Sequence, residues 1–266
     1  MENGSKYFTL ITGASTGLGK ELAIECASRK MNLILVSLPG ENLPCLCKLL
    51  KSEYKVIVQC YEIDLTLKNA PYKLFSWIND QFSLKIIINN AGIGGTIPFD
   101  QSSIKFIDDI IQLNIRAVSV LTRLLIPELK KHSRAYILNV SSMAAYSPMP
   151  YKSVYTASKA FIYHFSRGLR EELKGTSIRV SVLNPGPIMT NSDVIARILK
   201  QGFWGRIGLV TAKRIARIAI RSMLKERTVI IPGFFNKIYL VLVRLIPVSI
   251  VLPLIAMKLR KELEVT

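Results

Sequence analysis

The sequence predicts an α/β domain in which helices cover both faces of a doubly wound parallel β-sheet. The first observation is alternation, because short apolar runs are separated by amphipathic segments of helical length. The second is that these runs are apolar throughout, as in Asn32–Ser37 (NLILVS), which is typical of strands buried on both faces. The third is a glycine-rich turn after the first run. We expect one domain over residues 1–233, followed by a hydrophobic and basic C-terminal segment over residues 234–266.

The expected elements follow one another without repeats, low-complexity tracts or linkers. Apolar runs bounded by polar or turn residues predict seven strands: Tyr7–Ile11, Asn32–Ser37, Val56–Tyr61, Lys85–Ile88, Ala135–Val140, Ser177–Leu183 and Thr228–Ile231. Helical periodicity predicts six helices between and after them: Lys20–Arg29, Glu41–Glu53, Lys68–Gln81, Ile104–Lys131, Val154–Lys174 and Thr211–Lys225. The longest of these carries the polar Asn114 between Leu113 and Ile115, and we expect a break in the helix near that residue.

The glycine-rich turn lies between the first strand and the first helix and reads Thr12-Gly-Ala-Ser-Thr-Gly-Leu-Gly19. Gly13 allows a tight turn, Gly17 lets the backbone approach a ligand, and Gly19 permits close packing of the helix on the strand. The helix that follows presents free N–H groups and the positive end of its dipole. The turn is therefore expected to bind a pyrophosphate.

The pair Tyr155 and Lys159 is the strongest candidate for acid–base chemistry. Four residues apart on a helix, the two side chains lie on one face. A nearby ammonium favours the phenolate and is expected to lower the pKa of the phenol. Ser142 follows the apolar run Ala135–Val140, just before this helix. Its hydroxyl and the Tyr155 phenol can therefore approach one and the same small atom. Ser141 competes for this place, but adjacent strand residues face opposite ways, so one of the two serines points at Tyr155.

Composition and charge narrow the possible functions. Of 266 residues, half are hydrophobic and a fifth are charged, which is enough to bury a sizeable core. Lys and Arg number 36 against 18 acids, a net charge of +18. The stretch from Arg197 to Thr266 holds 14 basic residues and three acids, which points to lipid headgroups or nucleic acid. Because no recognition motif with interleaved aromatic residues is present, nucleic acid is not expected as a partner.

The cysteines resemble neither a disulfide framework nor a metal site. The chain has four of them, and the only histidines are His132 and His164. We expect no bound metal, and free thiols in a reducing cytoplasm. The polar start Met1–Lys6 does not fit a signal peptide, so a cytoplasmic location is expected, with possible peripheral attachment to a membrane. The cysteines are Cys26, Cys45, Cys47 and Cys60.

From roughly Tyr7 to Gly233, the chain resembles the classical short-chain dehydrogenase/reductase family. The resemblance rests on motifs in the family's order and spacing: TGASTGLG at 12–19, Asp64, NNAG at 89–92, Asn114, Ser142, Tyr155-x-x-x-Lys159, and Pro185-Gly186 through Thr190. It implies a Rossmann-type fold, a nicotinamide cofactor and the interconversion of a carbonyl and a secondary alcohol. It also implies a homodimer or homotetramer.

The resemblance further implies a role for each matched residue. Tyr155 would protonate the substrate oxygen, and Lys159 would lower its pKa and bind the nicotinamide ribose. Ser142 would polarise the carbonyl, and Asn114 would hold a water that links the lysine to solvent. Thr190 would contact the carboxamide. The full set of expected cofactor contacts is Gly13, Ser15, Thr16, Gly17, Leu18, Gly19, Ser37, Asp64, Leu65, Asn90, Ala91, Gly92, Tyr155, Lys159, Pro185, Gly186, Ile188 and Thr190.

The end of the second strand departs from the family's usual pattern. An acid there binds the ribose 2′-hydroxyl, whereas a basic residue accepts a 2′-phosphate. Here the segment Ser37–Gly40 (SLPG) has neither, and Thr16 in the glycine turn is also uncharged. The absence of an acid removes repulsion against a phosphate, and Ser37 could donate to it. We therefore expect NADP(H) in preference to NAD(H).

The C-terminal segment Ile238–Met257 (IYLVLVRLIPVSIVLPLIAM) is flanked by basic residues. Three interpretations remain open: a membrane-spanning helix, a segment lying in the membrane interface, and a flap over the substrate cleft or a dimer interface. All three imply a hydrophobic substrate. Candidates are 3-ketoacyl compounds, 3-keto sphingoid bases and steroids, which apolar side chains between Thr190 and Thr211 could line. The alternative function is a catalytically silent, cofactor-binding regulatory protein, and the intact Ser142–Tyr155–Lys159 set argues against it.

Overall fold

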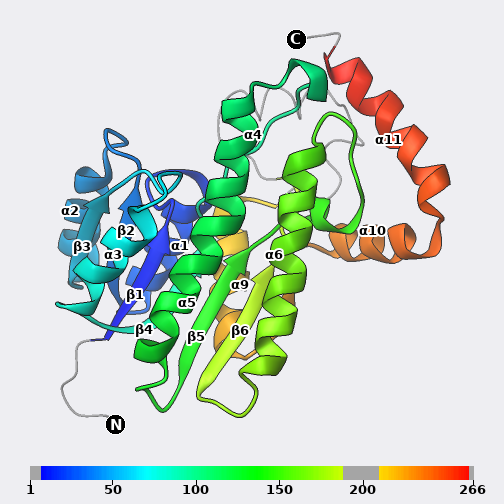
Figure 1. Ribbon diagram of the computed structural model, residues 1–266. Coiled ribbons are helices and arrows are strands. Elements are labelled where there is room, and N and C mark those ends of the chain that lie inside the picture. Colours follow the sequence, from blue (N-terminus) through cyan, green and yellow to red (C-terminus); the bar gives the residue numbers. More distant parts are fainter. Residues whose placement is uncertain (1–6, 188–209, 264–266) are drawn as a thin grey trace.

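The computed structural model describes residues 7–187 and 210–263, and a parallel sheet of seven strands forms its centre (Figure 1). The strand order is β3-β2-β1-β4-β5-β6-β7, so the chain winds outward from β1 to one edge and then from β4 to the other. This is the predicted doubly wound arrangement. The strands are β1 (Tyr7–Thr12), β2 (Asn32–Ser37), β3 (Val58–Glu62), β4 (Ser83–Asn89), β5 (Ala135–Val140), β6 (Ile178–Leu183) and β7 (Val229–Ile230).

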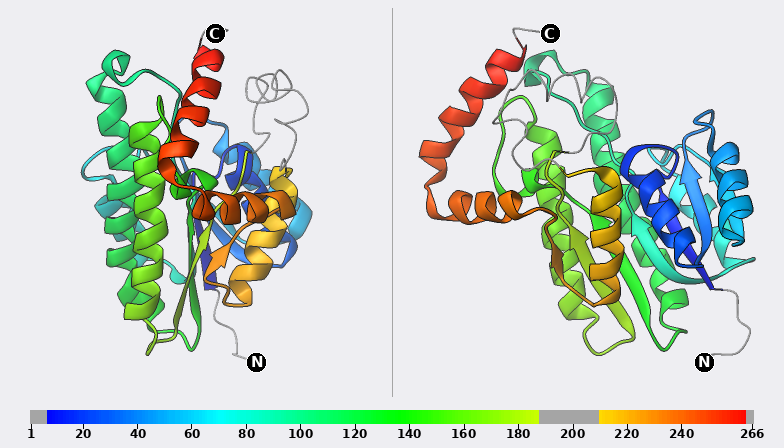
Figure 2. Two further views of the ribbon diagram at one scale, coloured as in Figure 1. Left: turned by 90° about the vertical axis from the view of Figure 1, so that its right-hand side faces the viewer. Right: turned by 180° about the vertical axis from the view of Figure 1, so that it is seen from behind.

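Alternate side chains along the strands enter two separate cores, one on each face of the sheet. In β2, Leu33 and Leu35 pack into one core, and Ile34 and Val36 pack into the other. Both positions of the strand repeat are therefore buried, which explains why the runs are apolar throughout. Figure 2 shows the two helical layers on either side of the sheet. One layer contains α1 (Gly17–Ser28), α2 (Leu43–Tyr54) and α9 (Ala212–Leu224), and the other contains α3 (Ala70–Asn79), α5 (Val118–Leu129) and α6 (Ser153–Glu172).

The predicted elements are present, with shifts at their ends. Helix α2 begins at Leu43 rather than Glu41, and α3 begins at Ala70 rather than Lys68. Each of these helices has a proline in its first turn, where a missing N–H costs no intrahelical hydrogen bond. Strand β3 begins at Val58 rather than Val56.

The helical segment after β4 widens where a break was expected. It begins as α4 (Ile104–Ile110), passes through the π-helical segment η2 (Ile111–Ala117) and continues as α5. Asn114 lies inside the π-helical segment and is 1% exposed. Within the described residues, Ile104–Leu129 is also the one helical stretch whose length and composition would allow it to cross a membrane. Its inner side chains nevertheless pack into the core beside α3.

The C-terminal segment forms two helices. They are α10 (Phe234–Leu245) and α11 (Val248–Leu263), and we call Phe234–Leu263 the C-terminal arm. Ile246 adopts extended backbone (φ −92°, ψ 128°), as the proline that follows it favours. Figure 2 shows α10 leaving the body of the domain and α11 turning at this connection. The short 3₁₀ helices η1 (Phe99–Gln101) and η3 (Met143–Tyr146) complete the described elements.

Candidate active site

The glycine turn after β1 has the backbone geometry that its sequence requires. Gly13 and Gly17 have positive φ angles of 64° and 53°, which side chains other than glycine rarely adopt. A Cβ at Gly19 would lie 1.8 Å from the carbonyl oxygen of Gly13, so α1 approaches the turn too closely for any other residue. The N-terminus of α1 therefore adjoins the turn directly, which suits a pyrophosphate.

Asn90 holds this turn in place from the end of β4. Its Nδ2 donates to the carbonyl oxygens of Thr12 (3.0 Å) and Gly13 (2.9 Å). The backbone N–H groups of Asn90 and Ala91 both donate to Thr12 Oγ1 at 3.1 Å. The Asn90 amide is thus used within the protein, where it links the end of β4 to the glycine turn. Thr12, which the sequence motifs did not mark as a site residue, is the hub of these contacts.

Ser142 is the serine that faces Tyr155. It caps η3, where its Oγ accepts from the N–H of Ala144 at 3.1 Å, and it is in hydrogen-bond contact with the Tyr155 hydroxyl. Ser141 points the other way and donates to the carbonyl oxygen of Lys159 at 2.7 Å. The strand alternation expected from the sequence therefore separates the two hydroxyls: one faces the phenol, and the other anchors α6 to the end of β5.

Lys159 and Asn114 complete the cluster beneath Tyr155. Lys159 is 5% exposed, and its Nζ donates to the carbonyl oxygen of Val140 at 3.2 Å. The Oδ1 of Asn114 accepts from Ile93 N (3.0 Å), and its Nδ2 donates to Ile93 O (2.9 Å) and to Ser158 Oγ (2.9 Å). A Cβ at Gly92 would lie 3.1 Å from both Lys159 Nζ and Asn114 Oδ1, so glycine there makes room for both groups.

The pKa values correct one expectation. Burial raises the pKa of Tyr155 above its usual value, and the hydrogen bond with Ser142 offsets part of that rise. We expected Lys159 to lower this pKa, but burial also lowers the pKa of Lys159, to about 8. The reason is shared, since desolvation penalises the charged form of each group. The ammonium lies 5.8 Å from the centroid of the phenol ring.

Several other predicted cofactor contacts are occupied within the chain. Ser37 is 3% exposed and donates to the carbonyl oxygen of Leu38 at 3.0 Å, so its hydroxyl does not face a ribose phosphate as we expected. Asp64 accepts from Thr66 N (2.9 Å) and Oγ1 (2.7 Å). The Leu65 side chain is buried in the core beside α3, which leaves its backbone for any cofactor contact.

The remaining predicted residues lie around the turn and at the end of β6. Thr16 precedes α1 in extended conformation, and Leu18 packs into the core below it. Pro185 accepts from Met143 N at 2.9 Å, which ties the loop after β6 to η3. Gly186 lies in the same loop. Ile188, Thr190 and the apolar stretch between Thr190 and Thr211 lie outside the described residues.

Gly94 is a site residue that the motifs did not reveal. A Cβ there would lie 2.3 Å from Cδ2 of Tyr155, so the backbone after β4 packs flat against the phenol ring. The signal in the sequence is the run Gly92-Ile-Gly-Gly95, in which the family motif ends at the first glycine and leaves the other two without a role.

Glu41 is the second residue that we missed. Its Oε2 accepts a hydrogen bond from Ser15 Oγ in the glycine turn. The segment Ser37–Gly40, which lacks both an acid and a base, ends at Gly40, whose positive φ of 82° turns the chain just before Glu41. An acid therefore does reach the side of the turn where the adenosine ribose of a dinucleotide is expected.

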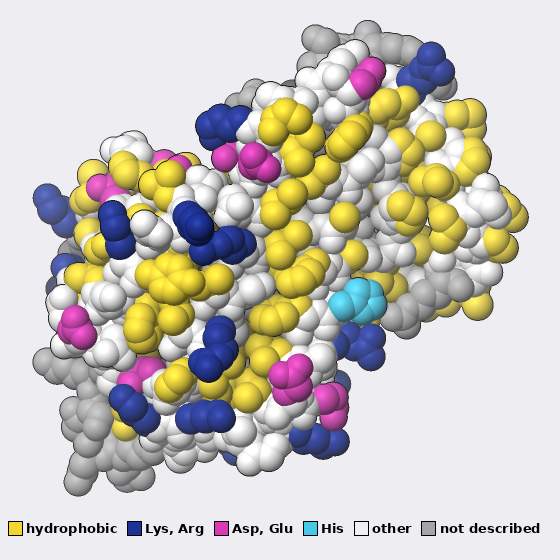
Figure 3. Space-filling model, viewed as in Figure 1, with side chains coloured by type: hydrophobic (Ala, Val, Ile, Leu, Met, Phe, Trp, Pro, Cys, Tyr) yellow, Lys and Arg dark blue, Asp and Glu magenta, His cyan; other side chains and the backbone are white. Residues whose placement is uncertain are grey.

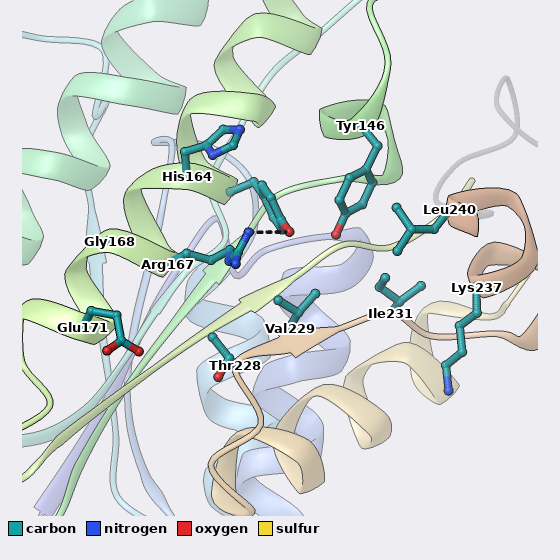
Figure 4. A pocket seen from close by; sticks show the side chains of 11 residues that line it. Tyr146, His164, Arg167, Gly168, Glu171, Thr228, Val229, Ile231, Lys237 and Leu240 are labelled. Atoms are coloured by element: carbon teal, nitrogen blue, oxygen red, sulfur yellow. Dashed lines mark hydrogen bonds between the residues drawn. The ribbon is translucent and has the colours of Figure 1, made fainter. Parts of the chain in front are cut away.

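Two hollows differ in their relation to this cluster. A narrow crevice of about 20 Å³ adjoins Tyr155 and is largely apolar, with Ile97, Phe99 and Phe106 in its wall. A larger cavity of about 850 Å³ lies between α6, β7 and α10 (Figure 4). Tyr155 does not line the larger cavity, which therefore lies apart from the chemistry. Within the described ranges, no cluster of three or more His, Cys, Asp or Glu residues could hold a metal ion.

Comparisons with known proteins agree with this arrangement. The very-long-chain 3-oxoacyl-CoA reductase of Anas platyrhynchos is 32% identical over 73% of the chain, which spans 64% of that protein. The inactive hydroxysteroid dehydrogenase-like protein 1 of Homo sapiens is 30% identical over 74% of the chain, and the chain spans 60% of it. A short-chain dehydrogenase from Sphingobium yanoikuyae, solved in complex with NADPH, is 28% identical, with a TM-score of 0.74 and coverage of 86% and 88% of the two chains. The family model described as short chain dehydrogenase matches residues 8–197, and the chain therefore belongs to the short-chain dehydrogenase family.

Proposed function

We propose that this protein is a nicotinamide-dependent oxidoreductase that interconverts a hydrophobic ketone and its secondary alcohol. One observation carries the proposal: Ser142, Tyr155 and Lys159 meet at the end of β5, beside the glycine turn. The turn fits a dinucleotide because Gly13 and Gly17 adopt the positive φ of a tight turn, and Gly19 lets the N-terminus of α1 pack against the Gly13 carbonyl. The nicotinamide of the bound cofactor would give or accept the hydride.

The chain's own residues would handle the proton. In reduction, Ser142 donates a hydrogen bond to the substrate oxygen, and Tyr155 transfers its phenolic proton to that oxygen as the hydride adds to carbon. Burial keeps the phenol protonated at neutral pH, as a proton donor must be. The Lys159 ammonium would stabilise the phenolate left behind. In oxidation the same phenolate would remove the proton. Asn114 would fix the backbone of Ile93 and the helix of Tyr155 around this centre.

The apolar crevice beside Tyr155 supports a hydrophobic substrate. Besides Ile97, Phe99 and Phe106, its wall includes Ile107, Ile110 and Val154. The duck relative is named for reduction of very-long-chain 3-oxoacyl-CoA, which supports a 3-ketoacyl compound as the first substrate to test. A 3-keto sphingoid base and a steroid ketone are the other two candidates, because each presents a carbonyl on a large apolar body.

NADP(H) is the cofactor that we propose, with a small preference over NAD(H). No acid stands between Ser37 and Gly40, which favours the phosphorylated form. The Glu41 carboxylate against Ser15 opposes it, because a 2′-phosphate there would meet a like charge. Since Glu41 is exposed, water and ions screen this repulsion. The preference should therefore survive, but be reduced.

The alternative is a catalytically silent protein that binds the cofactor for regulation. It has support from the human relative, whose name calls it inactive. The intact Ser142–Tyr155–Lys159 cluster argues against this alternative. A protein that only binds the cofactor would not require a proton donor next to a serine hydroxyl and a buried lysine.

A turnover screen separates the two functions. Purified protein would be mixed with NADPH or NADH and with a panel of hydrophobic ketones, and the nicotinamide absorbance would be followed. The proposed function requires ketone-dependent oxidation that Tyr155→Phe removes. Cofactor binding without turnover on any member of the panel would support the silent alternative.

A homodimer or homotetramer is the assembly that we propose. Ile104 on α4 and Phe161 on α6 are exposed apolar side chains, and Phe161, which is 39% exposed, stacks on Phe165 at 5.8 Å between ring centroids. Analytical ultracentrifugation of the wild type and of Phe161→Asp would test whether this surface joins subunits.

A further inference from the structure

The outward faces of both arm helices are apolar. In a soluble protein the apolar face of a surface helix turns toward the core. In α10 the buried side chain is instead a polar one, that of Asn236, which is 7% exposed. Figure 3 shows hydrophobic side chains gathered over the arm at the upper right. The exposed apolar residues are Phe234, Phe235, Ile238, Val241, Leu242, Leu245, Ile246, Val248, Ile250, Leu254 and Met257.

The inner face of α10 faces a hollow for part of its length. Lys237 and Leu240 line the large cavity opposite Tyr146 and Ile231 (Figure 4). The outer face of α10 remains open to solvent, with Leu245 74% exposed and Val241 55% exposed. A contiguous apolar surface of this kind marks an interaction site.

The charge around the arm identifies the partner. Lys237 and Arg260 are exposed near its two ends. The arm itself, Phe234–Leu263, holds five basic residues and one acid. A second copy of the chain would bring these like charges together around the apolar faces, whereas anionic headgroups would neutralise them. We propose that the arm docks on an anionic lipid surface, with α10 and α11 lying in the interface.

The geometry favours lying in the interface over crossing the bilayer. A spanning helix needs about 20 apolar residues. The apolar parts of the arm are the shorter helical stretches Phe234–Val243 and Val248–Met257, and extended backbone at Ile246 divides them. Two short helices joined by a bend can each lay one apolar face along a membrane surface, and the long basic side chains of the arm can reach the headgroups.

Asn236 connects the arm to the edge of the sheet at the carboxyl end of β5, where Ser142, Tyr155 and Lys159 meet. We call this the catalytic edge. Its Nδ2 donates to the carbonyl oxygen of Pro232 at 2.6 Å, and a Cβ at Gly186 would lie 2.5 Å from its Oδ1. The loop of Gly186 is joined to η3, which Ser142 caps. An arm lying on lipid would therefore hold the catalytic edge close to the membrane surface, where a hydrophobic ketone is concentrated.

Vesicle flotation of the full-length protein tests the proposal. Vesicles of phosphatidylcholine with about a third phosphatidylglycerol should carry the protein at low salt, and raising the salt to about 0.5 M should weaken binding because the cations are screened. The double variant Val241→Asp, Leu245→Asp should bind at least roughly tenfold more weakly, since two charges would enter the apolar layer. The matched control is Leu67→Asp, whose side chain is 60% exposed far from the arm and should leave binding unchanged.

Two further measurements decide the outcome. Lys237→Glu should weaken binding to the anionic vesicles by several-fold and leave any binding to pure phosphatidylcholine unchanged. Thermal unfolding and turnover of a water-soluble ketone should be unaltered in all three variants. The proposal is wrong if wild-type protein does not float with anionic vesicles at low salt. It is equally wrong if the double variant floats like wild type, or if it converts a stable dimer into a monomer, since a second copy would then be the occupant.

Discussion

The catalytic edge and the C-terminal arm differ in which side chains they bury and which they expose. At the edge, polar groups are buried and hydrogen-bonded within the chain, as Asn114 is to Ile93 and Ser158. On the arm, apolar groups such as Leu245 are exposed, and the described chain does not cover them. A buried polar group needs a partner, and an exposed apolar face needs a cover. Asn114 is thus satisfied within the chain, whereas the apolar groups of the arm require a surface from outside.

The largest expected effect tests the edge directly. Tyr155→Phe keeps the ring and removes the proposed proton donor, so turnover should fall by about 10²–10⁴-fold, the usual contribution of general acid catalysis. Cofactor affinity, measured by fluorescence titration, should change little. Tyr72→Phe, on a side chain 48% exposed in α3, is the control and should retain full turnover. Turnover of Tyr155→Phe within a few-fold of wild type would remove Tyr155 from the mechanism.

Gly94→Ala should have the next largest effect, because it tests how the edge is packed. Its Cβ would lie 2.3 Å from the Tyr155 ring, so the ring or the backbone must move. A displacement of about 1 Å at a reacting group can cost on the order of 10²-fold in turnover. Gly168→Ala is the control, since a Cβ there meets nothing within 4 Å. Equal turnover in the two variants would show that the close contact at Gly94 does not position the phenol.

The sequence predicts more of the catalytic edge than of the arm. Strands and helices could be predicted from apolar runs and helical periodicity. The Ser142–Tyr155–Lys159 cluster could be predicted from the spacing of Tyr155 and Lys159 on one helix face and from the family's motifs. Gly94 and Glu41 were missed because their roles arise from contacts across the fold, with Tyr155 and Ser15. The predicted boundary at residue 233 is crossed by Asn236, whose side chain packs against Gly186. The arm could be recognised as apolar, but its bend and outward faces depend on local backbone at Ile246 and on tertiary packing.

Lys159 should make the edge less stable at neutral pH than it would be without the charge. Its pKa is about 8 when folded and near 10.5 when exposed, so the unfolded chain binds more protons between these values. Stability should therefore rise with pH across this window. Lys159→Met should be more stable than wild type at pH 7, by on the order of 1–3 kcal/mol, yet inactive. Thermal unfolding measured at about pH 7 and about pH 10 should show the gap closing with pH; a gap independent of pH would contradict the buried charge.

Glu41→Gln should have the smallest effect, because Glu41 acts from an exposed turn. Removing the carboxylate beside Ser15 removes a like charge from the expected place of a 2′-phosphate, while the amide can still accept from the Ser15 hydroxyl. Through screened electrostatics, the affinity for NADPH relative to NADH should rise by about three- to tenfold. Titration of both cofactors against wild type, Glu41→Gln and the exposed control Glu53→Gln would measure it. A larger share of the gain at low salt would identify the cause as charge, whereas an unchanged ratio would mean that Glu41 turns away from Ser15 when the cofactor binds. Wild-type protein that already binds NADH more tightly would reverse the cofactor assignment and make Glu41 the acid that binds the ribose hydroxyl.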